Sequence, residues 1–358
     1  MTCLDGVRRK NACRPPMFKI TIILPTKMSK KRPVLPTFPA SQLTMFNRRQ
    51  LRIKVLHVLY AFHADKEGSV QDAHKHLMKS LEKTYDLYLL LLMLIGEFQD
   101  AAIERIEKGR MKKQPTSEDL HPNTKFVNNK PMRVIIKSKA IAKEAANRSL
   151  GWGQEQDLVK KLFKSLVASE EYIAYMENEE RGFQHDRESL NRMFRKHIVN
   201  DESLQEWLEE QSIMWSDDLD LACSIVLKTV KTISEDSDDL TLSGMWKEEG
   251  DDREFLENLF SKTLDLTGEH DALIEKAASN WDLDRIATID LILLRMALAE
   301  ARSFETVPLK VTMNEYIDLA KFYSTEKSGA FVNGVLDKLF DAMREDGTIV
   351  KTGRGLIG

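Results

Sequence analysis

The sequence contains few of the residues that would point to a stapled, fibrous or membrane-spanning chain. Three cysteines are too few for a disulfide scaffold. Glycine and proline number only 16 and 10 among 358 residues, which excludes collagen-like and low-complexity chains. The longest apolar run, residues 87–95, is well short of the roughly 18 to 20 residues that cross a bilayer. We therefore expect a globular, cytoplasmic protein without a membrane segment.

The net charge of −3 conceals a strong segregation of charge along the chain. Residues 1–44 carry nine Lys and Arg against one acid, whereas residues 201–252 carry sixteen acids against three lysines. Such asymmetry is consistent with nucleic-acid contact in one region and an acidic module in another. Helical proteins also show it by chance, so charge alone identifies no partner.

The first 44 residues differ from the rest of the chain because six of the ten prolines lie there. Proline removes backbone donors, and the segment shows no helical period. Its short apolar run lacks the length and the cleavage site of a secretory signal. We predict a disordered basic extension, or an artefact of an upstream start codon, before Met45.

From Met45 onward the apolar residues recur at helical spacing. In residues 45–64 a single stripe is formed by Leu51, Val55, Val58 and Phe62. No segment alternates with a period of two for long enough to form a sheet. The sequence therefore predicts an all-α protein, with further helical blocks over residues 70–109, 132–200, 202–230, 252–278, 281–302, 309–323 and 328–344.

Loop signals and changes in charge predict five regions. These are an extension (1–44), N-terminal helices that begin with an arginine-rich helix (45–110), a charge-rich helical insertion ending in an acidic linker (111–250), a C-terminal helical bundle (251–345) and a tail (346–358).

Motifs for catalysis or cofactor binding are weak throughout. The glycines of residues 353–358 match GxGxxG, but no predicted strand precedes them, so a dinucleotide site is not expected. His74 and His76 are two residues apart on a predicted helix, so their side chains point in different directions and cannot chelate together. We expect no cofactor, no metal and no enzymatic activity, and hence a binding protein.

The first helix has an unusual charge pattern. Arg48, Arg49 and Arg52 lie in its first two turns, after a predicted N-cap at Asn47. Cations at a helix N-terminus oppose the helix dipole, which favours an external anion there. Guanidinium groups can neutralise phosphates and stack on unpaired bases, as in single-stranded RNA binding. The alternative is a solvated basic face with no ligand.

Three ordered motifs in the last third of the chain carry a family resemblance. They are NWDLDRIATIDLILLRMALAE (280–300), PLKVTMNEYIDLAK (308–321) and FVNGVLDK (331–338). Together with RRQLR (48–52) and the following Leu59 and Tyr60, they resemble the NusB transcription antitermination factor family. The stretch from about 65 to 250 is similar to the enlarged central region of long variants.

The resemblance implies a fold of two packed antiparallel helical bundles, here with an additional helical insertion. It implies an RNA-binding factor that binds boxA-type single-stranded RNA of rRNA transcripts and promotes processive transcription. The implied partners are NusE, which is a small-subunit ribosomal protein, and the antitermination complex on RNA polymerase. A homodimer remains an open alternative.

The resemblance also assigns roles to individual residues. It implies RNA contacts by Arg48, Arg49, Arg52, Lys327, Ser328 and Phe331 and partner contacts by Tyr60 and Asp290. Ser328 is also a predicted N-cap of the last helix, Pro308 is a predicted first residue of the preceding one, and Phe331 either stacks on a base or belongs to the core. The remaining motif positions are expected to be structural: Arg295, Glu300, Asn314, Glu315, Asn333 and Gly334. Of these, the two asparagines are expected to be hydrogen-bonded inside the bundle, and Arg295 and Glu300 to form interhelical ion pairs.

Two other functions remain open at this point. One is a helical protein–protein scaffold that uses the insertion and has no RNA role. The other is the RNA-binding part of an rRNA methyltransferase, which would need an α/β domain with a glycine-rich loop and catalytic cysteines. The sequence shows no such domain.

Overall fold

The computed structural model describes residues 43–65, 67–212, 215, 217–278 and 283–356. This part of the chain forms fifteen α-helices, and its only β-type pairing is a single bridge between Thr44 and Gly244. The all-α prediction is therefore confirmed. The predicted disorder of residues 1–44 falls outside the described residues except for Leu43 and Thr44, which pair with the segment at Gly244.

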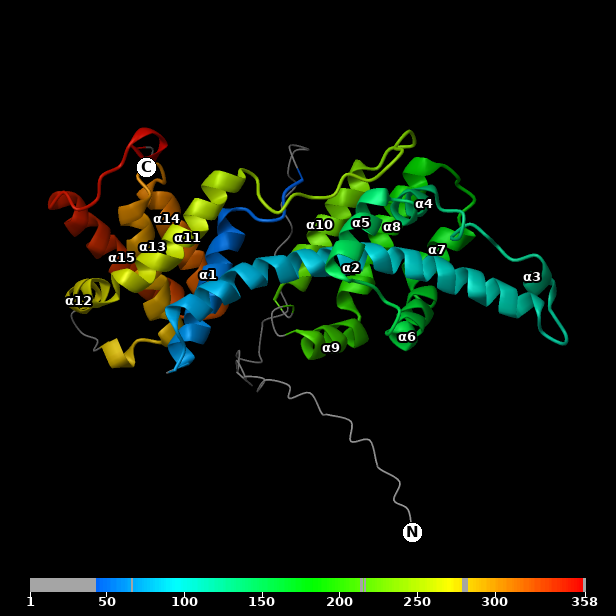
Figure 1. Cartoon of the computed structure of the whole chain (residues 1–358), viewed down its shortest axis with the longest axis horizontal. Coiled ribbons are helices and arrows are strands. Elements are labelled where there is room, and N and C mark those ends of the chain that lie inside the picture. The colour runs from blue at the N-terminus through cyan, green and yellow to red at the C-terminus, as the bar shows by residue number, and fades with distance from the viewer. Residues whose placement is uncertain (1–42, 66, 213–214, 216, 279–282, 357–358) are drawn as a thin grey trace, which may run out of the picture.

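The helices form two bodies (Figure 1). The first, which we call the terminal bundle, unites the first helix with the last five. It consists of α1 (Arg48–Ala64), α11 (Glu249–Asp265), α12 (Thr267–Ala277), α13 (Thr288–Ser303), α14 (Leu309–Tyr323) and α15 (Ser328–Glu345). The N-terminal helix therefore packs against segments about 200 or more residues later in the sequence, so α1 and the last helices share one core.

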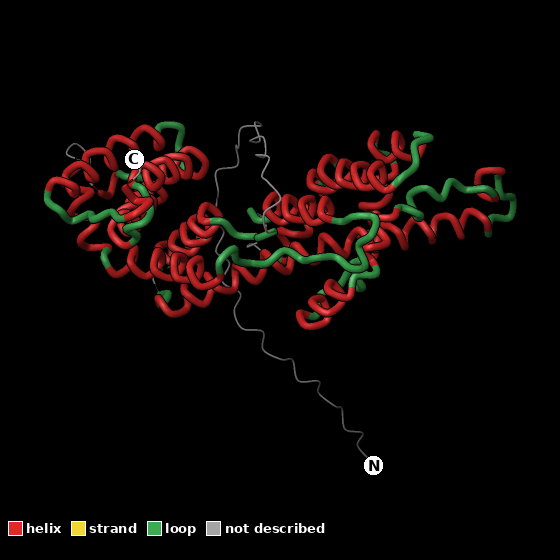
Figure 2. The backbone as a smooth tube through the Cα atoms, turned by 90° about the horizontal axis from the view of Figure 1, so that it is seen from above, coloured by secondary structure: helices red, strands yellow, loops and turns green. Residues whose placement is uncertain are grey.

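The second body, the insertion, is built on one long helix. Helix α2 (Val70–Arg110) has 41 residues, begins beside the terminal bundle and continues to the far end of the molecule (Figures 1 and 2). Shorter helices pack along it or on one another: α3 (Ser117–Leu120), α4 (Lys130–Ile136), α5 (Lys139–Arg148), α6 (Gln156–Val167), α7 (Glu170–Glu177), α8 (Phe183–Lys196), α9 (Glu202–Gln211) and α10 (Leu219–Thr232).

Two tryptophans attach the shorter helices of the insertion to the middle of α2. The indole N–H of Trp152 donates to the Leu90 carbonyl at 2.8 Å, and that of Trp215 donates to the Lys83 carbonyl at 2.7 Å. Trp152 is almost fully buried. Because each ring fills apolar space while its N–H is satisfied by the α2 backbone, these contacts hold the shorter helices in register with α2. None of the helices in the described ranges is both long enough and apolar enough to cross a membrane.

Helix starts follow local capping chemistry at several places. Asn47 caps α1 as predicted, and it forms a reciprocal capping box with Gln50. The predicted cap at Ser328 was wrong by one residue, because Ser328 is the first residue of α15 and its hydroxyl bonds to Asp290 instead. Pro308, predicted as a first helical residue, is the N-cap of α14.

Helix α1 is fixed by buried ion pairs on two opposite faces. The guanidinium of Arg52 donates from Nε and Nη2 to the two carboxylate oxygens of Glu300 on α13, at 2.7 Å each. The Lys54 ammonium lies 2.6 Å from both carboxylate oxygens of Asp218 at the start of α10, which also accept from Thr84 on α2. Residues two apart on a helix point about 200° apart. Thus Arg52 fastens α1 to the terminal bundle, while Lys54 fastens it to the insertion.

Glu300 is the centre of a fully satisfied polar cluster. Besides Arg52, it accepts hydroxyl hydrogen bonds from Thr312 at 2.9 Å and Tyr316 at 3.0 Å, and its own side chain has no exposed surface. Burial by itself lowers the pKa of Arg52, but the charge and hydrogen bonds of Glu300 outweigh it, so the pKa of Arg52 is raised overall. Arg52 therefore stays charged within the core.

The glycine-rich end of the chain has a packing role. Lys351 donates to the carbonyls of Ala301 and Phe304 at the end of α13, at 2.8 and 2.9 Å. A Cβ at Gly355 would lie 1.9 Å from the carbonyl oxygen of Glu305, so only glycine fits where the tail crosses this loop. Within the GxGxxG match, Gly355 is thus explained by close backbone approach, and Gly353 by its positive φ of 51°.

We predict that Glu300→Gln lowers the free energy of unfolding by about 3–5 kcal/mol, because it leaves the buried Arg52 charge uncompensated. Urea denaturation of the full chain would measure this. As a control, Asp318→Asn alters a half-exposed carboxylate and should change stability by less than about 0.5 kcal/mol. The double variant Arg52→Met/Glu300→Gln should be more stable than Glu300→Gln alone. Equal stability of Glu300→Gln and wild type would contradict the importance of this pair.

A second prediction concerns acid sensitivity. His270 on α12 is fully buried, and neither ring nitrogen has a hydrogen-bond partner among the described residues. Burial, with a smaller contribution from Arg302, lowers the pKa of His270 to about 4. Since the unfolded chain binds this proton near the ordinary pKa of 6.5, folding stability should fall as pH drops from about 6.5 toward 4, by about 1 kcal/mol per unit. Thermal unfolding across this range should show a shallower loss for His270→Leu; an identical slope in both proteins would refute the assignment.

Candidate nucleic-acid interface

Two of the three clustered arginines lie on the surface at the start of α1. About 40% of each side chain of Arg48 and Arg49 is exposed, and the first turn of α1 contains no acid. The free backbone N–H groups and the helix dipole add positive potential at this end. This surface, which we call the α1 face, thus presents two partly exposed cations at a positive helix terminus.

The ion pairs of the α1 face are loose. Arg48 Nε lies 3.5 Å from Asp252, and its guanidinium lies over the Phe255 ring, 4.3 Å from the centroid. Arg49 Nη1 is 3.6 Å from both Glu315 and Asp318. These distances exceed those of charge-assisted hydrogen bonds, about 2.7–2.9 Å, so an external anion can compete for both guanidiniums.

The expectation that Arg52 contacts RNA does not fit its position. Only 3% of Arg52 is exposed, and Glu300 engages its guanidinium in a bidentate pair. Because Arg52 donates two hydrogen bonds to Glu300 and is enclosed by the bundle, it cannot reach an external phosphate. We reassign it to the core, where it also lies 3.7 Å from Glu315.

Glu315 lies between the exposed and the buried arginine. Its Oε2 atom is buried, is 3.6 Å from Arg49 and 3.7 Å from Arg52, and makes no hydrogen bond within the described residues. The single carboxylate therefore balances two cations by charge at short range. Sequence reasoning treated Glu315 only as a structural position and missed Asp252 and Asp318, because nothing local indicates that they face α1.

The structure also places Ser328 in the interior. Its hydroxyl donates to Asp290 Oδ2 at 2.7 Å, and Ser328 and Asp290 are 2% and 5% exposed. The expected phosphate contact of Ser328 and the expected partner contact of Asp290 are corrected accordingly: both side chains are used within the bundle, where they fix the start of α15 against the start of α13. Tyr60, the other expected partner residue, is half-buried on α1 and packs against the core.

Lys327 and Phe331 lie near the beginning of α15. Lys327 is exposed, whereas Phe331 is half-buried and packs against the core. On α13, Asp290 contacts the start of α15 through Ser328, and Glu300 contacts Arg52 of α1. Asp290 and Glu300 are ten residues apart, which is about 15 Å along the helix. The structure therefore does not gather the six residues expected to bind RNA into one site: Arg48 and Arg49 lie at one end of the bundle, Lys327 and Phe331 toward the other.

The remaining motif residues divide between core and surface. Arg295 forms a bidentate ion pair with Asp271 of α12, at 2.7 and 2.8 Å. Asn314 and Asn333, expected to be hydrogen-bonded inside the bundle, are exposed, so that expectation was wrong. They lie on the outer faces of α14 and α15, beside the buried Thr312 and Val332. Gly334 is exposed as well, and a side chain there would meet open space.

Part of the chain is similar to known proteins of one family. The model of the NusB family matches residues 224–341, from within α10 to within α15. The Transcription antitermination protein NusB of Salinibacter ruber is 53% identical over 106 residues, which are 30% of this chain and 66% of that protein. The proteins of the same name from Chloroherpeton thalassium and Natranaerobius thermophilus are 41% and 35% identical over 105 and 92 residues, which are 29% and 26% of this chain.

These matches have a limited extent. They span 50% and 66% of the latter two relatives, and no solved structure matches the chain. At 358 residues, the chain contains a large region outside the family match, which includes α1 and most of the insertion. On the strength of residues 224–341 and of these relatives, the chain belongs to the NusB family, as a long variant of it.

Proposed function

We propose that this protein is a transcription antitermination factor that binds single-stranded RNA through the α1 face. The observation that carries the proposal is the pair of half-exposed, loosely held arginines at the positive end of α1, on the bundle that contains the family match. The three relatives carry the name Transcription antitermination protein, which supports the same role. Such a factor works by binding and needs no catalytic group.

The chemistry of the α1 face suits a phosphate backbone. A phosphate can compete with Asp252 for Arg48, and with Glu315 and Asp318 for Arg49, because the existing distances of 3.5 and 3.6 Å are long. The Arg48 guanidinium lies over the Phe255 ring, and a planar guanidinium of this kind can stack on an unpaired base. Arginines mostly position the backbone, so the preference for a boxA-type sequence rests on the family resemblance.

Lys327 and Phe331 provide a second contact for the same strand. They lie near the Asp290 end of α13, whereas the arginines lie near the Glu300 end. The ten residues between these two positions span about 15 Å of helix. A single strand that starts at the α1 face and runs along α14 would reach both. The half-buried Phe331 then offers a ring edge to a base, and Lys327 offers a charge to phosphate.

The proposed protein partner is a NusE-type small-subunit ribosomal protein, within an antitermination complex on RNA polymerase. Tyr60 is the expected contact that remains partly accessible. Asp290 acts instead as a positioning residue, since its bond to Ser328 fixes the junction of α13 and α15. Its second oxygen, Oδ1, is buried without a hydrogen-bond partner among the described residues, so this junction has an unused acceptor.

A helical scaffold without an RNA role is the second candidate. It is favoured by one observation: each of the three clustered arginines has a carboxylate of the same chain within 4 Å. In that case the α1 cations would only stabilise the bundle. The two functions predict different effects of removing Arg48 and Arg49: RNA affinity falls if the protein binds RNA there, and it is unchanged if the protein is a scaffold.

We predict that Arg48→Ala/Arg49→Ala weakens binding of a boxA-like single strand at least tenfold at fixed salt. Fluorescence anisotropy of the full chain, with and without the purified ribosomal-protein partner, would measure it. The slope of log affinity against log salt should fall by about 1.4, since each phosphate contact contributes about 0.7. A scrambled strand tests sequence preference.

The matched control is Lys338→Ala/Arg344→Ala, which removes two cations from the later part of α15. It should leave affinity for the boxA-like strand within twofold of wild type. Equal losses in both double variants would show unspecific attraction, and unchanged binding by the α1 variant would favour the scaffold.

A further prediction concerns Lys327. Lys327→Asp reverses an exposed charge at the start of α15 and should weaken RNA binding severalfold at fixed salt. Lys338→Asp, on the same helix, is its control. An affinity unchanged by Lys327→Asp would remove this residue from the RNA path.

A further inference from the structure

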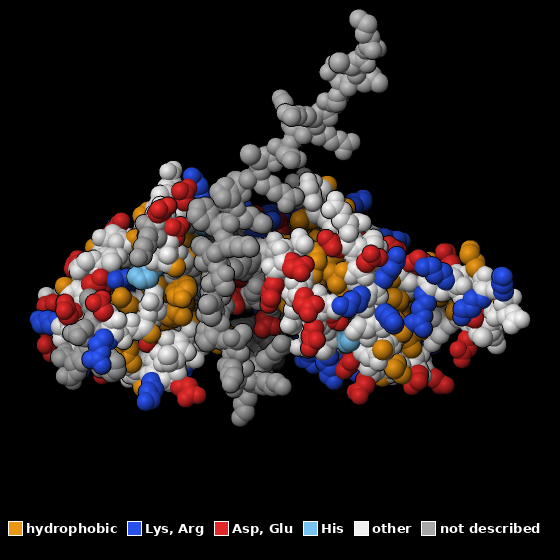
Figure 3. All heavy atoms as spheres, turned by 90° about the horizontal axis from the view of Figure 1, so that it is seen from below, with side chains coloured by type: hydrophobic (Ala, Val, Ile, Leu, Met, Phe, Trp, Pro, Cys, Tyr) orange, Lys and Arg blue, Asp and Glu red, His pale blue; other side chains and the backbone are white. Residues whose placement is uncertain are grey.

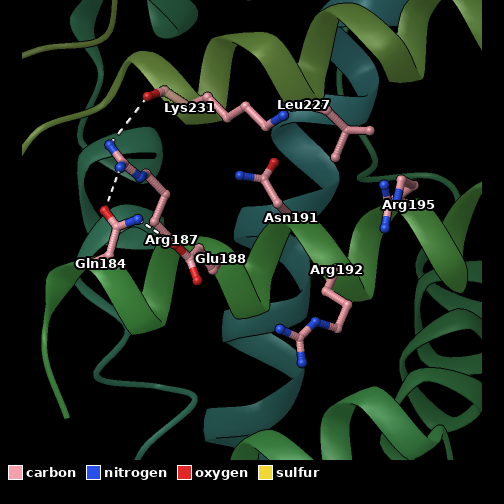
Figure 4. Close-up of a pocket in the computed structure, with 8 residues that line it drawn as sticks. All are labelled: Gln184, Arg187, Glu188, Asn191, Arg192, Arg195, Leu227 and Lys231. Atoms are coloured by element: carbon pink, nitrogen blue, oxygen red, sulfur yellow. Dashed lines mark hydrogen bonds between the residues drawn. The ribbon is translucent and has the colours of Figure 1, made fainter. Parts of the chain in front are cut away.

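The insertion contains a basic groove between α8 and α10. Its volume is about 440 Å³, and it is lined by polar and charged side chains on both helices (Figure 4). The cations are Arg187, Arg192 and Arg195 from α8 and Lys231 from α10, against one carboxylate, Glu188. The groove thus has an excess of three positive charges, although the segment from residue 201 to 252 is strongly acidic in composition.

Three of these cations have no ion-pair or hydrogen-bond partner among the residues that the structure describes. The fourth cation, Arg187, is already hydrogen-bonded within the protein. It donates to the carbonyl of Ile233 at 2.7 Å and to that of Lys231 at 3.2 Å, and so caps the end of α10. The side chains of Arg192, Arg195 and Lys231 are exposed, and among the described residues they make neither ion pairs nor hydrogen bonds. Unlike the arginines of the α1 face, they are not neutralised by carboxylates.

The other polar groups of the groove do not neutralise these cations either. Glu188 accepts a hydrogen bond from the Gln184 amide and pairs with none of the cations. The Asn191 side chain points from α8 toward α10, between Lys231 and Leu227 (Figure 4). Its Oδ1 is buried and makes no hydrogen bond with a described residue. The groove floor therefore holds an amide whose hydrogen-bonding capacity is not used by the protein.

We propose that this groove is a second RNA-binding site, which takes the phosphate backbone of a single strand. Arg192 and Arg195 are three residues apart on α8, so their side chains emerge on the same face about one turn apart. Lys231 lines the groove from α10, on the other side of Asn191 (Figure 4). Cations along the two walls of an open groove are the arrangement that tracks a charged backbone without reading its bases.

The lining favours RNA over an acidic peptide. Protein interfaces usually depend on apolar or aromatic anchors in pockets. Here Leu227 is the one purely aliphatic side chain of the lining, and no aromatic ring lines the groove. The planar guanidinium forks of Arg192 and Arg195 match phosphate geometry instead. Figure 3 shows Lys and Arg side chains gathered over one face of the insertion, so the insertion is not uniformly acidic.

This site lies outside every motif that carries the family resemblance, and it does not require the α1 face to bind RNA. The test uses the full chain and two labelled RNAs, a boxA-like strand of about 12 nucleotides and one of about 30 nucleotides that extends it, lengths chosen to cover one site or two. Anisotropy titrations compare wild type, Arg192→Ala/Arg195→Ala and the control Lys160→Ala/Lys164→Ala. The control removes two cations of α6 outside the groove.

The groove variant should bind the long strand at least fivefold more weakly than wild type, with a salt slope lower by about 1.4. It should bind the short strand as wild type does, and the control should match wild type on both. An unchanged affinity of the groove variant for the long strand would overturn the proposal, as would an equal loss in the control. Circular dichroism melting of all variants checks that each is folded, since all four substituted side chains are exposed.

Two further results separate this inference from other possibilities. If Arg48→Ala/Arg49→Ala leaves both affinities unchanged while the groove variant loses the long strand, the groove is established and the proposed function of the α1 face fails. A poly-glutamate peptide that binds wild type more tightly than the long RNA, and loses affinity in the groove variant, would overturn the RNA assignment in favour of an acidic protein ligand.

Discussion

The arrangement of this molecule depends on the two buried ion pairs of α1. Arg52 with Glu300 fastens one face of the helix to the terminal bundle, and Lys54 with Asp218 fastens the opposite face to the insertion. A buried charge that loses its partner is costly, so both pairs strongly disfavour any other rotation or register of α1. Because α1 is held in this way, the positions of Arg48 and Arg49 one turn earlier are also determined. The buried polar groups thus position the exposed ones.

Three arginines within five residues have different roles that the sequence does not distinguish. Arg48, Arg49 and Arg52 are the same residue type within the first two turns of one helix, and the helical period only places Arg52 nearer the apolar stripe. Its role is set by Glu300, 248 residues away, and by the hydroxyls of Thr312 and Tyr316. Sequence reasoning could recognise a cation cluster and could expect Glu300 in an ion pair, but it had no means of joining the two. The same limit applies to Ser328 and Asp290, which bond to each other.

Local signals, in contrast, predicted much of the fold. The apolar stripe of α1, the Asn47 cap and the all-α architecture follow from periodicity and capping chemistry. What periodicity could not supply was the side of a helix on which a polar motif residue lies. Asn314 and Asn333 were expected inside because interior asparagine needs partners, yet both are on the outer faces of their helices. Composition did not reveal the groove of the insertion, because its cations come from two helices far apart in sequence, α8 and the otherwise acidic segment that contains Lys231.

If both proposed sites bind the same RNA, its path is longer than the terminal bundle. Photo-crosslinking of a 4-thiouridine-labelled boxA-containing transcript to the full chain, followed by mass spectrometry, would locate that path directly. We expect crosslinked peptides from the start of α1 and from α14 and α15, with a second set from α8 when the transcript extends past boxA, and none from the buried segment around Glu300. Crosslinks confined to other surfaces, with none at α1, would contradict the role assigned to the α1 face.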